Sequence, residues 1–170
     1  TRGQDVEAAQ VERWGLAGDR RFLVVDDDSR HVTASEDARL LSVSAVERGA
    51  SELILHGPRA DPVVVHVFGR PTTKVHIWGD EVSAVRPSAE ADAWFSALLG
   101  REVGLVWLND PTSRPVNPAY GVPGDTVSFA DGYPLLLTAT ASLSQLNDWI
   151  TATAAERGEF DVEPLTMRRF

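Results

Sequence analysis

Short apolar runs separated by Gly, Pro and Asp dominate the first half of the chain, a pattern that is typical of β-strands. The run at 22–25 ends at the acidic turn 26–29, and residues 31–33 are placed to return as its hairpin partner. Further strands are predicted at 52–56, 62–68, 73–78, 81–85 and 103–108. Many short strands with regular turn signals favour a barrel or a sandwich over alternating strands and helices.

Two segments instead repeat apolar residues with the 3.6-residue period of an α-helix. In 88–99, five apolar side chains share one face, Ser88 suits the N-cap, and Gly100 suits the position after the last turn. In 141–155, four apolar side chains share one face, and Thr140 is the predicted cap. We therefore expect a mainly β fold with a few helices (α+β).

The region between the helices carries four prolines from residue 109 to residue 124, which predicts a linker or a loop draped over the surface. We place the domain boundary there, with a first domain at 1–110, a Pro-rich linker at 111–125 and the start of a second domain at 126–170. Strands are predicted at 126–129 and 135–138. The second unit is too small to be complete, so it is interpreted as a truncated domain.

The acidic charge balance narrows the classes of partner that the chain could bind. The 25 acidic and 16 basic residues give a formal net charge of −9, which disfavours nucleic acid and anionic membrane surfaces as partners. The chain has no cysteine, which excludes disulfides and thiolate metal sites within these residues. No apolar run approaches the roughly 18 residues of a membrane span. The default expectation is a soluble cytoplasmic protein.

Most polar clusters have an ordinary explanation. His66 and His76 lie on neighbouring predicted strands, but spacing suggests no third metal ligand. The three aspartates at 26–28 lack the alternate ligands and distal Glu of an EF-hand, so they are interpreted as a solvated hairpin tip. No catalytic residue and no metal ligand is predicted in this sequence.

The informative stretch is Trp-Gly-Leu-Ala-Gly-Asp-Arg-Arg-Phe at 14–22. Two glycines three residues apart, then Asp19, Arg20 and Arg21, place charged side chains at a tight loop that leads into a strand. An arginine there can present its planar guanidinium to a carboxylate or a phosphate. Alternatively, Asp19 and one arginine pair locally and stabilise the turn, since such surface pairs are common and weak. Spacing leaves both readings open.

The same stretch, followed by Val-Val-Asp, Thr33-Ala34 and Arg39-Leu40, resembles the opening of the MOSC N-terminal β-barrel domain. That domain precedes the MOSC domain, which is named for the C-terminal domain of molybdenum cofactor sulfurase. Residues 92–100 resemble the closing helix of the N-terminal domain. Residues 127–138, with Ala-Ser-Leu at 141–143 and Leu-Asn at 146–147, resemble the start of the MOSC domain proper. The resemblance covers nearly the whole chain in the right order.

The resemblance implies a β-barrel fold, a molybdopterin-type molybdenum cofactor and reduction of N-hydroxylated compounds, as in the mitochondrial amidoxime-reducing components and their bacterial relatives. It implies an iron–sulfur or cytochrome electron donor and a small N-oxygenated substrate. Arg20 matches the arginine that contacts the anionic tail of the cofactor, flanked by Asp19 and Arg21. Thr138 and Ala139 match a segment that lines the cofactor, where many relatives have Ser in place of Ala139.

Residues 167–170 resemble the beginning of a segment that continues Arg-Pro-Asn in the family. The resemblance implies that this continuation, a Lys-Ser pair and the metal-ligating Cys lie outside this sequence. The chain is thus expected to be the N-terminal portion of a molybdenum-dependent oxidoreductase and inactive by itself. The alternatives are a non-catalytic β-barrel interaction module and a sulfur-carrier role in cofactor metabolism. The family has also been linked to pyridoxal phosphate, which binds to a lysine as a Schiff base. Lys74 is the only lysine of this sequence, and it lies in a strand pattern, so we discount this cofactor.

Overall fold

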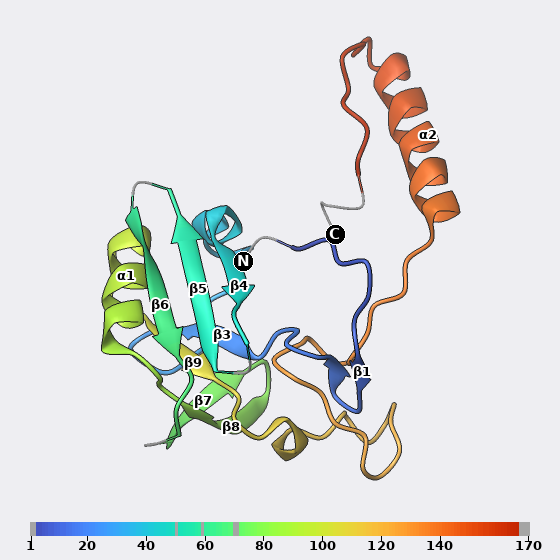
Figure 1. Ribbon diagram of the computed structural model, residues 1–170. Coiled ribbons are helices and arrows are strands. Elements are labelled where there is room, and N and C mark those ends of the chain that lie inside the picture. Colours follow the sequence, from blue (N-terminus) through green and yellow to red (C-terminus); the bar gives the residue numbers. More distant parts are fainter. Residues whose placement is uncertain (1–2, 50, 59, 70–71, 167–170) are drawn as a thin grey trace. The chain divides into compact units, whose positions relative to one another are not determined.

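The computed structural model describes residues 3–49, 51–58, 60–69 and 72–166 (Figure 1). The predicted start of the Arg-Pro-Asn segment at 167–170 lies outside these residues. The chain groups into two compact units, Thr1–Leu135 and Leu136–Phe170, which are described separately. The expected mainly β architecture with a few helices is confirmed.

The first unit contains two antiparallel sheets and a short hairpin. The four-stranded sheet has the order β3 (Phe22–Val25), β9 (Gly104–Trp107), β8 (Asp80–Val85), β7 (Thr72–Ile77). The three-stranded sheet has the order β4 (Ser44–Glu47), β5 (Glu52–Gly57), β6 (Ala60–His66). The hairpin pairs β1 (Val11–Glu12) with β2 (Gly15–Leu16).

Residues 29–31 connect the two outer strands of the four-stranded sheet. His31 forms a bridge with Val25 of β3, and Arg30 forms a bridge with His76 of β7. The segment predicted at 31–33 as a hairpin strand is therefore a pair of isolated bridges. It divides its backbone hydrogen bonds between two strands, so it does not extend along either one.

The main core lies between the three-stranded sheet, β3, β9 and helix α1 (Ala89–Leu99). Alternate residues of the strands point to this core because successive side chains of a strand face opposite sides. The Ser88 hydroxyl accepts a hydrogen bond from the Ala91 N–H at 3.1 Å, and Gly100 ends the helix in the left-handed conformation with φ 60°. Both predicted caps of this helix are confirmed.

The prolines at 111–123 belong to a loop that packs on the first unit. The 3₁₀ turn η2 (Pro111–Ser113) buries Pro111, and the Val116 N–H donates to the Asp125 carbonyl at 3.0 Å. The domain boundary at 111–125 stays a prediction.

The strands predicted at 126–129 and 135–138 are wrong. In this part of the described chain only Thr126 forms a bridge, with Pro115, and residues 127–139 are neither helix nor strand. A strand needs a partner with free backbone groups. Three carbonyls of the bends at 128–134 instead accept hydrogen bonds from the Arg114 side chain.

The second unit consists of helix α2 (Thr140–Glu156) and the segment that follows it. The helix is confirmed, but its N-cap is Ala139 and not the predicted Thr140, and no side chain caps it. The Asn147 side chain holds the following segment through two hydrogen bonds to the Leu165 backbone, at 2.8 and 3.0 Å. None of the described helices is both long and apolar enough to cross a membrane.

Candidate functional site

The loop that precedes β3 depends on glycine at its start. Gly15 has φ 130°, and a Cβ atom there would lie 2.9 Å from the backbone oxygen of Pro134. Gly18 has φ 78°, and the following Arg20 is left-handed with φ 49° although it carries a side chain. Non-glycine residues adopt this conformation at a cost, and they keep it only where the surroundings hold them.

Arg20 is held in place by two anchors. Its Nε donates to Asp19 Oδ2 at 2.8 Å, and its Nη2 donates to the Pro134 carbonyl at 3.0 Å. The Arg20 side chain is 40% exposed, and its Nη1 makes no hydrogen bond to any residue within the described ranges. The local Asp–Arg pair is therefore present, and it leaves Nη1 without a hydrogen-bond partner among the described residues.

Arg21 has a different environment. Its Nε donates to the Leu108 carbonyl at 3.0 Å, and its Nη2 donates to the same oxygen. The guanidinium lies 6.0 Å from the ring centroid of Trp14 and 5.9 Å from that of Trp107, within cation–π range. Burial lowers the pKa of Arg21, and the carboxylates of Glu12, Glu47 and Asp110 oppose that shift.

A cavity of about 280 Å³ opens beside Arg21. Three carboxylates, those of Glu12, Glu47 and Glu52, line it together with this single guanidinium. An anionic group would meet net negative charge there, so the surroundings of Arg21 fit the anionic tail of a cofactor poorly. Arg20, whose partner is one carboxylate and whose Nη1 is open, fits such a group better.

Sequence reasoning missed Arg114, which at 3% exposure is the most buried charged residue among those that the structure describes in the first unit. Its Nε donates to Asp80 at 2.9 Å, its Nη1 to the carbonyls of Ser128 and Ala130, and its Nη2 to the carbonyl of Asp131. No sequence signal marks this residue, because its partners lie 14 to 34 positions away.

The predicted site residues fall into both units. Asp19, Arg20 and Arg21 are neighbours in the loop before β3. Thr138 and Ala139 belong to the second unit, where both are exposed, and the Ala139 carbonyl accepts from the Leu143 N–H at 3.1 Å. The role of all five residues in cofactor binding stays a prediction.

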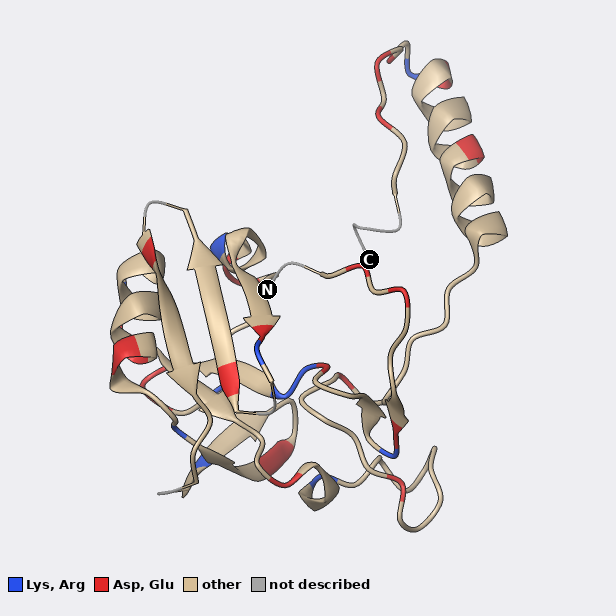
Figure 2. Cartoon of the chain, viewed as in Figure 1, with Lys and Arg blue, Asp and Glu red and all other residues tan. Residues whose placement is uncertain are grey.

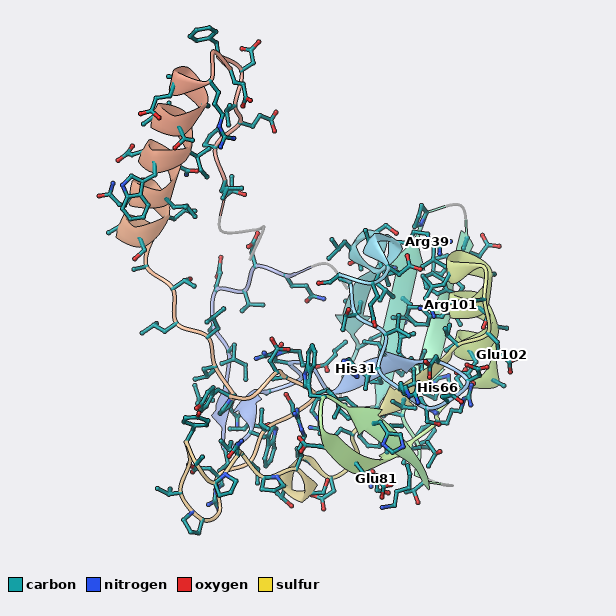
Figure 3. All side chains as sticks on the ribbon, turned by 180° about the vertical axis from the view of Figure 1, so that it is seen from behind. His31, Arg39, His66, Glu81, Arg101 and Glu102 are labelled. Atoms are coloured by element: carbon teal, nitrogen blue, oxygen red, sulfur yellow. The ribbon has the colours of Figure 1, made fainter. Side chains whose placement is uncertain are left out.

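His66 and Lys74, which the sequence singled out, have structural partners. His66 lies 3.4 Å from Glu52 and stacks on Phe68, and Lys74 pairs with Glu81 at 2.7 Å. Figure 3 labels His66 and Glu81. Among the described residues, no three His, Cys, Asp or Glu side chains are grouped to hold a metal. Among the described residues, the Lys and Arg positions coloured blue in Figure 2 are scattered along the ribbon.

Comparison with known proteins now decides the family. The model of the MOSC N-terminal beta barrel domain matches residues 1–102. The chain belongs to this family. Human mitochondrial amidoxime reducing component 2 is 30% identical over 158 residues, covering 86% of this chain and 47% of that protein. Human mitochondrial amidoxime-reducing component 1 is 27% identical over 158 residues, with coverage of 86% and 46%.

The MOSC-family chain thus spans about half the length of the curated relatives it matches. A solution structure of a Bordetella bronchiseptica protein has the same fold, with a TM-score of 0.52 and 18% identity. It covers 69% of this chain and 100% of its own. The expected family and its β-barrel-type fold are therefore confirmed.

Proposed function

We propose that this chain is the N-terminal portion of a molybdenum-cofactor-binding oxidoreductase that reduces N-hydroxylated compounds. The support is the family match over residues 1–102 together with relatives named for amidoxime reduction. The proposed substrate is a small N-oxygenated compound, and the proposed electron donor is an iron–sulfur or cytochrome protein. These relatives are named as mitochondrial, whereas our proposal for this chain is a cytoplasmic location.

The observation that carries the proposal is the open Nη1 of Arg20. Asp19 and the Pro134 carbonyl fix the plane of the guanidinium, so little rotamer entropy is lost when a further oxygen binds. A charge-assisted hydrogen bond to an anionic cofactor tail is shorter and stronger than a neutral one. In the second unit, we propose that Thr138 contributes its hydroxyl to cofactor binding and that Ala139 contributes only its backbone.

The cofactor, when bound, supplies the two-electron chemistry at its metal, and the residues of this chain hold and orient it. The 170 residues contain no cysteine, so a thiolate ligand to the metal has to come from outside them. We therefore propose that this portion alone does not catalyse the reaction.

The test compares two arginine variants in the full-length protein. Arg20→Ala removes the proposed contact, and Arg30→Ala is the matched control, because Arg30 is an exposed arginine that pairs with a neighbouring aspartate, Asp28, at 3.6 Å. Loss of a hydrogen bond to a charged group costs about 1.5–3 kcal/mol, which corresponds to about tenfold or more in cofactor affinity. Elemental analysis should show less molybdenum in Arg20→Ala and no change in Arg30→Ala. Equal molybdenum contents would reduce Arg20 to a turn-stabilising residue.

One observation favours a second candidate function, a non-catalytic β-barrel interaction module. Arg20 already has a carboxylate partner in Asp19, and the neighbouring cavity is acidic, so the charge of Arg20 is paired without an added anion. In that case the full-length protein would purify folded and free of molybdenum.

A further inference from the structure

The side chain of Arg114 is buried in a way that demands partners. Transfer of a guanidinium from water into a protein interior is unfavourable unless its N–H groups are satisfied. Each of its three nitrogens donates here: Nε to the Asp80 carboxylate, Nη1 to two carbonyls and Nη2 to a third. Asp80 is half exposed, so the pair joins the surface of β8 to the interior.

The three carbonyl acceptors belong to one irregular segment. Residues 128–134 form bends and pair with no strand in the described part of the chain. Buried backbone carbonyls nevertheless require hydrogen-bond donors. The Arg114 guanidinium supplies them to Ser128, Ala130 and Asp131, and so takes the place of a neighbouring strand.

The other side of this segment supports the loop that carries Arg20. The Ser128 N–H donates to the Trp14 carbonyl at 3.4 Å, and the Phe129 N–H donates to the Arg20 carbonyl at 2.9 Å. Pro134 then accepts from Arg20 Nη2. The segment between Ser128 and Pro134 thus contacts both the backbone and the side chain of Arg20.

We propose that Arg114 is a positioning residue for Arg20, acting through residues 128–134. Arg114 fixes the carbonyls of this segment, and the segment holds Arg20 in its left-handed conformation through the Phe129 N–H and the Pro134 carbonyl. The part of this inference that concerns the cofactor rests on the proposed function. The part that concerns the loop does not, so the two are tested separately.

The first experiment measures backbone amide hydrogen exchange in the 170-residue chain. Arg114→Lys keeps the charge but cannot donate to four acceptors at once. We expect the Phe129 amide to exchange about tenfold faster or more, because its acceptor loop loses its support, while the Leu105 amide of β9 is unchanged. Arg39→Lys is the control, since Arg39 also joins an aspartate, Asp37, to a backbone carbonyl, that of Leu99.

Asp80→Asn is a milder second variant, which keeps the three hydrogen bonds from Arg114 to carbonyls. It tests the same inference if Arg114→Lys fails to fold. We expect it to raise Phe129 exchange in the same direction and by less. Unchanged exchange at Phe129 in both variants, or an equal increase in Arg39→Lys, overturns the inference.

The second experiment measures molybdenum per folded chain in the full-length protein for Arg20→Ala, Arg114→Lys and the double variant. If Arg114 acts through Arg20, the double variant retains as much molybdenum as Arg20→Ala alone. If the losses of the two single variants multiply, Arg114 acts independently and the inference fails. Faster exchange at Phe129 combined with full molybdenum content in Arg20→Ala would instead sink the proposed role of Arg20 and leave the support of its loop by Arg114 established.

Discussion

Replacing Gly15 by alanine adds a methyl group next to the Pro134 carbonyl, which accepts a hydrogen bond from the Arg20 side chain. Gly15 has φ 130°, a conformation that costs a non-glycine residue about 1–3 kcal/mol. The new Cβ would also lie 2.9 Å from the Pro134 oxygen, which is backbone and cannot rotate away. Such overpacking costs about 1–3 kcal/mol. The two costs together amount to about 2–6 kcal/mol.

Gly49→Ala is the matched control. Gly49 also has a positive φ, 68°, but a Cβ there meets nothing within 4 Å. Its cost is therefore the conformational one alone, about 1–2 kcal/mol. The difference between the two variants combines the contact with Pro134 and the higher conformational cost of φ 130° over φ 68°.

The assay is urea unfolding of the 170-residue chain followed by far-UV circular dichroism. With a slope of about 2 kcal/mol/M, Gly49→Ala should lower the midpoint by about 0.5–1 M and Gly15→Ala by about 1–3 M. The Phe129 amide should also exchange faster in Gly15→Ala alone. Equal midpoints for the two variants would refute the claim that Gly15 is required by the Pro134 carbonyl.

Two further predictions concern local structure in the first unit. Hydrogen bonds from the Thr33 backbone and hydroxyl lower the pKa of the Glu36 carboxyl below its ordinary value of 4.5. The ionised carboxylate therefore contributes to the stability of the fold above pH 4.5, and this contribution is lost as the pH falls through the lowered pKa. Urea midpoints measured at about pH 5.5 and about pH 3 should therefore fall less in Glu36→Gln than in the wild type, and an equal fall would contradict this assignment. Ser88→Ala removes the N-cap of α1 and should lower the free energy of unfolding by about 1 kcal/mol, whereas Ser142→Ala in α2, which caps nothing, should leave it nearly unchanged.

Elements whose signals are local could be predicted from the sequence. Helix α1 was specified by its apolar period, by Ser88 and by Gly100, all within thirteen consecutive residues. Strand β3 was bounded by charged residues on both sides. Strand β4 was missed because Ser-Ala-Val-Glu carries a weak apolar pattern, and the strand is stabilised by its ladder with β5.

The failures involve partners far away in the sequence. Residues 126–138 have strand-like composition, but composition does not show whether a partner strand is available. Arg114 could not be recognised because its role depends on Asp80, on residues 128–131 and on its burial. For the same reason, sequence spacing left two readings of Asp19 and Arg20 open. The structure shows the local pair, together with an open nitrogen on Arg20.

The most direct test of the account is the molybdenum content of the full-length wild-type protein, produced in a host that makes the cofactor and purified as a folded monodisperse species. The account predicts molybdenum in stoichiometric amount, retained through gel filtration. A folded protein that contains no molybdenum would contradict it.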